Sequence, residues 1–155
     1  MKKLLSIICI FTVLSTFAQK VDSSKTPIIS YGSISISMTN SDNFKKSSYA
    51  SVEGGIMKGK VGVGAMFGRG SLYGLGSKTD NIQNYFYEVK TFFSYPIDNL
   101  SVGVLFGYGG YFKTSHNFIE YGATVAYNVK KISYGMTCSN WDGLTYITPS
   151  LTYNF

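Results

Sequence analysis

The stretch SVGVLFGYG at residues 101–109 decides the fold of this chain. Its even positions hold valine, valine, phenylalanine and tyrosine, and its odd positions hold mostly glycine, with one serine and one leucine. Successive side chains of a β-strand point to opposite sides, so alternation at every second residue separates two faces. The stretch therefore predicts a strand with one broad apolar face and one face of small side chains.

The same alternation recurs in seven further segments along the chain. They span residues 33–38, 49–56, 61–68, 85–95, 119–127, 132–139 and 146–155. A tilted strand of about ten residues is long enough to cross a bilayer. The pattern therefore predicts an all-β fold, an eight-stranded antiparallel up-and-down transmembrane β-barrel.

The gaps between the segments alternate in length. The short gaps are residues 58–60, 96–100 and 128–131, and the mostly longer, polar gaps are 40–47, 70–83, 113–117 and 140–144. Short turns at one end and longer loops at the other are typical of an outer-membrane barrel, whose turns face the periplasm. We expect the apolar faces to meet lipid and the glycine, serine and threonine faces to fill a narrow lumen. The competing fold is a soluble secreted β-sandwich.

The composition fits this architecture. Charged residues make up 14% of the 155 residues, against about 25% in an ordinary soluble domain. Two cysteines are too few for a disulfide scaffold, and the 16% of aromatic residues argue against disorder. No metal site and no cofactor are expected, because the chain has one histidine and neither a CxxC nor an HExxH motif.

Residues 1–18 are expected to be a secretory signal peptide. Lys2 and Lys3 precede an apolar run at 4–14, and the small residues Thr16 and Ala18 precede a cleavage point before Gln19. Residues 19–155 would then form the barrel domain. Cleavage lowers the net charge of +6 by two, so the basic balance gives no reason to expect a nucleic-acid partner.

Four charged residues fall on the inward faces of the expected strands. They are Glu53, Glu88, Lys90 and Glu120. Charges in so narrow a lumen must pair or be neutralised, which predicts a structural ion-pair network around the lysine. Three carboxylates exceed one lysine, so at least one should hold a proton or find another donor, such as Arg69, a tyrosine or water. The alternative is a narrow gated pore through the lumen lined by these glutamates and the lysine.

The loops carry the remaining candidate residues. Tyr73, His116 and Trp141 fall in the longer gaps and are expected to make contacts at the surface, either with lipid headgroups or with an extracellular partner. His116 beside Ser115 leaves a surface lipid hydrolase as a further alternative. Their adjacent spacing and the inward direction of Glu120 argue against a triad, so no catalytic residue is expected.

The end of the chain carries a family resemblance. Leu151, Tyr153 and the terminal Phe155 resemble the terminal signal read by the outer-membrane assembly machinery. Together with the eight segments, they make residues 19–155 similar to the small outer-membrane barrels of the OmpA-transmembrane and OmpX type. The Ala18-Gln19 junction resembles those of secreted proteins of Bacteroidota. Pro149 departs from the pattern, because it lacks a backbone N–H inside a strand, and predicts a bulge or locally broken pairing.

This resemblance implies a protein of the cell outer membrane that crosses the inner membrane by its signal peptide. It implies membrane lipid and the assembly machinery as partners, and a monomeric state. The expected role is non-enzymatic, either structural or as an adhesion-like surface interaction through the extracellular loops.

Overall fold

The computed structural model describes residues 26–39, 48–72, 82–113, 116–141 and 143–155. The expected signal peptide, Tyr73 and Ser115 lie outside these ranges. The described strands are β1 (Ile28–Thr39), β2 (Ser48–Lys58), β3 (Val61–Leu72), β4 (Ile82–Ile97), β5 (Leu100–Tyr111), β6 (Asn117–Val129), β7 (Ile132–Trp141) and β8 (Leu144–Asn154). None of the described segments forms a helix long and apolar enough to cross a membrane.

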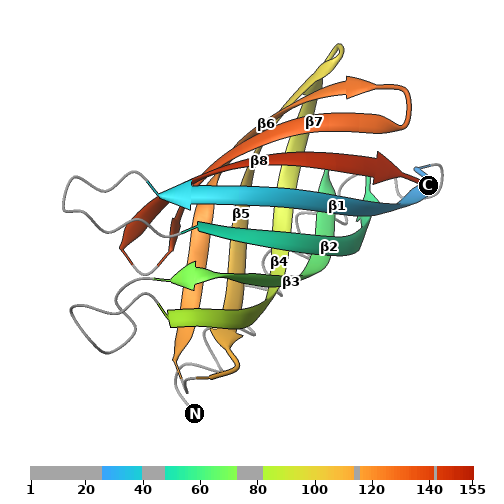
Figure 1. Cartoon of the computed structure of the whole chain (residues 1–155). Helices are drawn as coiled ribbons and strands as arrows, with labels where there is room; N and C mark the ends of the chain where they lie inside the picture. The colour runs from blue at the N-terminus through green and yellow to red at the C-terminus, as the bar shows by residue number, and fades with distance from the viewer. Residues whose placement is uncertain (1–25, 40–47, 73–81, 114–115, 142) are drawn as a thin grey trace.

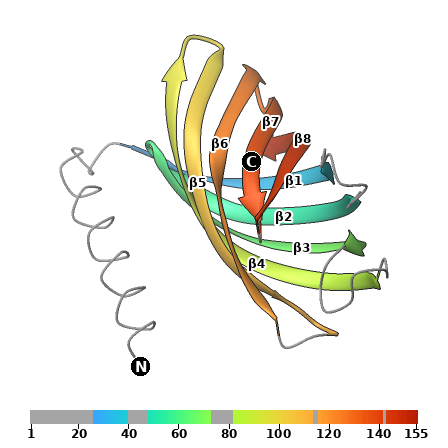
Figure 2. The same ribbon diagram turned by 90° about the vertical axis from the view of Figure 1, so that its left-hand side faces the viewer.

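Each strand pairs antiparallel with the next, and β8 returns to pair with β1. The sheet is therefore closed into a barrel with a simple up-and-down order (Figure 1). Seen from the side, the wall made by β1 to β4 crosses the wall made by β5 to β8 at a steep angle (Figure 2), as the tilt of barrel strands requires. The predicted fold class is confirmed.

The two faces of the wall differ as the alternation predicts. Outward valine, isoleucine, leucine, phenylalanine and tyrosine side chains are exposed on all eight strands, while their neighbours on the inward face are buried or half-buried. On β5, for example, Val104 and Phe106 are exposed and Leu105 and Gly107 are buried. An apolar outer wall around a lumen packed with its own side chains is the arrangement of a small transmembrane barrel.

The two ends of the barrel are connected differently. At one end, β2–β3, β4–β5 and β6–β7 are joined by two residues each, and the first of the two, Gly59, Asp98 or Lys130, has a positive φ between 53° and 62°. At the other end lie the connections 40–47, 73–81, 112–116 and 142–143. These ends are called the turn end and the loop end below.

The last connection is shorter than the sequence predicts. We expected a loop over 140–144, but β7 continues through Trp141 and β8 starts at Leu144, directly opposite. Gly143 adopts a φ of 78°, a left-handed conformation that suits glycine and allows a tight reversal. Only two residues therefore separate these strands.

Pro149 interrupts the seam where β8 closes on β1. Pairing with β1 runs through Ser35 and Ser150 and resumes at Met38 and Ile147, with the two positions between left unpaired. The offset is the same on both sides of the gap, and Met136 of β7 pairs with Pro149. The predicted break in pairing is confirmed, and the alternative of a bulge is wrong, because a missing donor removes contacts without inserting a residue.

Candidate functional site in the barrel lumen

An ion pair occupies the middle of the lumen. Lys90 Nζ on β4 lies 2.7 Å from Glu53 Oε2 on β2, and both side chains are mostly buried. Tyr31 on β1 donates its hydroxyl to Glu53 Oε1 over 2.6 Å. The tyrosine is therefore a second donor to the carboxylate that Lys90 already pairs, whereas Arg69 is exposed on the outer wall.

A glycine on the intervening strand allows the side chains of Lys90 and Glu53 to meet. Gly64 on β3 lies between the two charged strands and pairs directly with Lys90. A Cβ atom at Gly64 would contact the Tyr31 hydroxyl and would lie 2.8 Å from Glu53 Oε1. The side chains of β2 and β4 meet across β3 because this position has no side chain of its own.

The other two carboxyl groups lie next to each other. Glu88 on β4 is fully buried, Glu120 on β6 is almost so, and the two carboxyl groups interact electrostatically. Gly107 of β5 pairs with Glu120, and a Cβ atom at Gly107 would overlap the Glu88 carboxyl group, which lies over it. Neither Glu88 oxygen accepts a hydrogen bond from the described residues. The lumen therefore holds one ion pair and one pair of neighbouring carboxyl groups.

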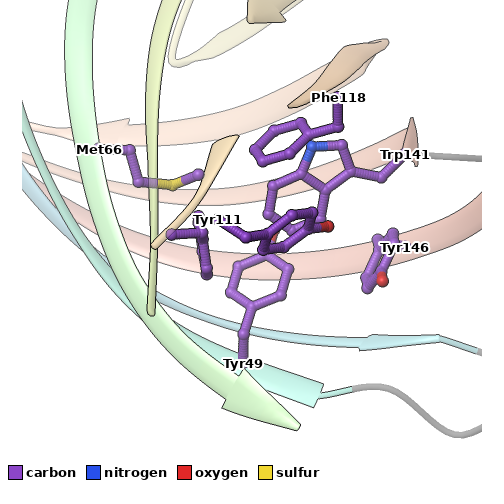
Figure 3. Packing of buried hydrophobic residues seen from close by; sticks show 7 residues of the cluster. Tyr49, Met66, Tyr111, Phe118, Trp141 and Tyr146 are labelled. Carbon is purple, nitrogen blue, oxygen red and sulfur yellow. The ribbon is translucent and has the colours of Figure 1, made fainter. Parts of the chain in front are cut away.

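Aromatic side chains close the loop end of the lumen. We call this cluster the aromatic plug, and it consists of Tyr49, Met66, Phe86, Tyr111, Phe118, Trp141 and Tyr146. Seven strands, β2 to β8, contribute one residue each to it, and most of its members lie within three residues of a loop-end strand terminus. The rings of Trp141 and Phe118 pack together (Figure 3), with centroids 4.3 Å apart. The centroids of Trp141 and Phe86 lie 4.9 Å apart. These separations are those of packed aromatic pairs.

The expectation that Trp141 is an exposed loop contact is wrong. Its side chain is 1% exposed and stands at the centre of the aromatic plug (Figure 3). The signal was present in the alternation, because Trp141 continues the inward positions Ser133, Gly135, Thr137 and Ser139 of the same strand. The predicted loop began at residue 140, whereas β7 continues through Trp141. The indole was therefore predicted at the surface although it lies in the lumen.

His116 lies at the rim of the plug. It is exposed, precedes β6, and stacks against Tyr111 with ring centroids 6.0 Å apart. Glu120 is buried in the lumen and pairs along the wall with Trp141. The structure thus places His116 and Glu120 in different surroundings, one at the rim and one inside. Within the described residues, no group of three His, Cys, Asp or Glu side chains could hold a metal ion.

The lumen between the ion pair and the seam is lined by hydroxyl groups. Hydrogen bonds join Ser35 to Ser51 over 2.6 Å and Thr152 to Ser33 over 3.0 Å. Toward the turn end, the rings of Tyr31 and Phe92 meet edge to face at 5.7 Å. Side chains therefore fill the lumen in successive layers: an aromatic pair, an ion pair, a carboxyl pair and the aromatic plug.

The three residues of the terminal signal share the outer face of β8. Leu151, Tyr153 and Phe155 are all exposed, and the rings of the last two lie 5.1 Å apart. The Phe155 N–H donates to the Ser30 carbonyl of β1 over 2.8 Å. The chain end is thus fixed at the turn end of the seam with its apolar side chains pointing outward.

Comparison with known proteins gives a likeness of fold. No protein-family model matches the chain, and no curated protein matches it. The crystal structure of the N-terminal β-barrel domain of Pseudomonas aeruginosa OprF is similar, with a TM-score of 0.58 and 10% sequence identity over 83% of this chain and 97% of that one. A porin structure refined at 1.8 Å aligns with a TM-score of 0.33 and 11% identity over 81% of this chain and 47% of that one. The OprF domain and this chain share the closed barrel architecture.

Proposed function

We propose that this protein is a monomeric, non-enzymatic barrel of the outer membrane that acts through its loop end and does not conduct through its lumen. The observation that carries the proposal is a closed wall, apolar outside, around a lumen that holds a mostly buried ion pair in its middle and the aromatic plug at its loop end. A closed barrel of this kind can anchor loops at a membrane surface. Its role is structural, or an adhesion-like contact with an extracellular partner.

Cell fractionation tests the location. The protein should sediment with the outer membrane, and the folded form should migrate faster than the boiled form in a gel, because closed barrels resist unfolding by detergent. Recovery in the soluble fraction, with no mobility change on boiling, would contradict the proposal and favour a secreted β-sandwich.

The proposed route to the membrane uses residues 1–18 as a signal peptide and the outward Leu151, Tyr153 and Phe155 as the signal for the assembly machinery. Phe155→Ala should reduce the amount assembled in cells several-fold. The same variant should refold into detergent micelles as completely as the parent, because Phe155 makes few packing contacts and is 73% exposed. Phe112→Ala removes another exposed ring, far from the chain end. It is the matched control and should assemble normally.

The loops supply the surface contact in this proposal. The two candidate contact residues are His116, which lies exposed at the rim of the aromatic plug, and Tyr73, which belongs to the connection 73–81. Replacing 73–81 with a short glycine and serine linker should leave heat-modifiable folding unchanged and abolish binding of whole cells to surfaces or partner cells. Unchanged cell binding after replacement of both 40–47 and 73–81 would contradict a role for the loops and leave a structural one.

A further inference from the structure

The outer wall of the barrel is not evenly filled. A groove of about 660 Å³ runs across β8, β1, β2 and β3 and is lined mainly by apolar side chains. Ala50 lies at its base, directly between Ile36 of β1 and Arg69 of β3 in the register. A methyl group between two long side chains leaves a depression, and the unpaired seam beside Pro149 continues it.

A cation stands at one edge of this groove. Arg69 is exposed and faces outward on β3. Among the outward positions of the described strands, the other charged residue is Lys58, which ends β2 beside a turn. A charge on a wall that faces lipid is unfavourable unless an oppositely charged or aromatic group lies near it. Arg69 is therefore a charged departure from the apolar wall, and it lies directly beside the groove.

Aromatic side chains place Arg69 at the height of the lipid headgroups. Its guanidinium lies over the Tyr85 ring, 5.3 Å from the centroid, and Tyr85 stacks on Phe67 at 5.8 Å. Phe112, just after the loop end of β5, packs against Phe67 at 5.8 Å. Clusters of outward aromatic residues near strand ends mark the membrane interface. Arg69 thus lies at the level of the lipid phosphate groups, and the apolar groove lies beside it.

We propose that this groove binds one molecule of a phosphate-bearing lipid of the outer leaflet, with an acyl chain over Ala50 and the phosphate at Arg69. The apolar lining matches the chain, and the guanidinium matches the phosphate by charge and by its planar donors. Tyr85 holds the guanidinium at the interface, so the cation is already oriented before the lipid arrives. The proposal rests on the outer wall facing lipid and is independent of what the loops bind.

Methyl NMR in dodecylmaltoside, a detergent without phosphate, tests the site. The full chain is titrated with dioleoylphosphatidylglycerol, with dioleoylglycerol, which has the same chains and no phosphate, and with glycerol 1-phosphate, which has no chains. The Ile36 and Leu151 methyl groups should shift and saturate with the phospholipid. Dioleoylglycerol should bind about tenfold more weakly, the factor expected for one lost charge-assisted contact, and glycerol 1-phosphate should cause no shift.

Substitutions at two positions, with matched controls, separate a binding site from general solvation by lipid. Arg69→Gln should remove the difference between the phospholipid and dioleoylglycerol, and Arg69→Lys should keep most of it. Ala50→Leu fills the groove and should abolish saturation, with Ala50→Val as a smaller replacement if folding suffers. Lys58→Gln and Ala123→Leu make the same changes elsewhere on the outer wall and should leave binding unchanged.

Three results would overturn the proposal. The first is equal affinity for the two lipids in the parent protein, and the second is unchanged affinity in Arg69→Gln. The third is an Ala123→Leu variant weakened as much as Ala50→Leu. Shifts of Ile36 that grow with protein concentration before lipid is added would instead assign the groove to a second copy of the chain. Heat-modifiable mobility checks that every variant is folded.

Discussion

The ion pair between Lys90 and Glu53 is the contact whose loss should change stability most among single polar residues. Lys90→Met leaves Glu53 in the lumen with Tyr31 as its remaining donor, and removing one partner of a buried pair costs about 3 kcal/mol. Glu53→Gln should cost less, because Lys90 also interacts with Glu88 and Glu120. Urea unfolding in lipid vesicles measures both values.

The double variant completes this test. If Lys90 and Glu53 stabilise the barrel as a pair, Lys90→Met with Glu53→Gln should be more stable than the sum of the single losses predicts, by about 1–3 kcal/mol. Strict additivity would contradict a direct coupling and would attribute each loss to local packing.

Gly64 should tolerate no side chain. A Cβ atom there contacts the Tyr31 hydroxyl and approaches Glu53, so Gly64→Ala should lower the free energy of unfolding by about 1–3 kcal/mol through overpacking. Gly54→Ala is the matched control, because its Cβ would point outward, 3.9 Å from the nearest atom, the Tyr31 carbonyl oxygen. The two alanine variants, compared by the same urea titration, should differ clearly. Equal stability would show that the lumen yields at Gly64.

At the scale of strands, the seam between β1 and β8 is interrupted where Pro149 supplies no donor. Pro149→Val should restore pairing with β1 and raise the free energy of unfolding by about 1 kcal/mol, the net value of one hydrogen bond. Hydrogen exchange at Ile36 and Ser37 should slow in the variant and stay unchanged in Pro96→Ala, beside the β4–β5 turn. Fast exchange that persists at Ile36 would show that the break has another cause.

The alternation of the sequence predicts the strands and their faces well, because a pleated strand must send successive side chains to opposite sides. The suggestion that Arg69 donates to the lumen glutamates is wrong, because Arg69 continues the outward positions 61, 63, 65 and 67 of β3 and is exposed. The ends of strands are harder to predict, because a tight turn such as the one at Gly143 adds residues to both strands. For that reason Trp141 was expected in a loop.

The partners inside the lumen could not be predicted from one strand at a time. Lys90 meets Glu53 across β3, and Glu88 lies beside Glu120 across β5. Which carboxylate a lysine reaches depends on the register between strands and on the absence of side chains at Gly64 and Gly107. The alternation shows that four charged residues face inward. Only the closed sheet shows that Lys90 pairs with Glu53 and that Glu88 lies near Glu120.

At the scale of the whole molecule, the successive layers of the lumen should prevent ion flow. In planar bilayers the parent protein should show no stable conductance, because the aromatic plug fills the loop end and the ion pair fills the middle. Trp141→Ala removes the central ring of the plug and should destabilise the barrel by about 3–5 kcal/mol. It should still not conduct, since Lys90, Glu53 and Tyr31 remain below it.

A variant that opens both layers is the decisive comparison. Trp141→Ala with Lys90→Ala removes the central ring of the plug and the long side chain that crosses the middle of the lumen, and should give flickering conductance if the packed layers alone close the barrel. Tyr95→Ala with Lys60→Ala, at the outer turn end where that ammonium lies 4.1 Å from the centroid of the tyrosine ring, is the control and should stay silent. A parent protein that conducts steadily would contradict the closed barrel proposed here and favour a pore through the Glu- and Lys-lined lumen.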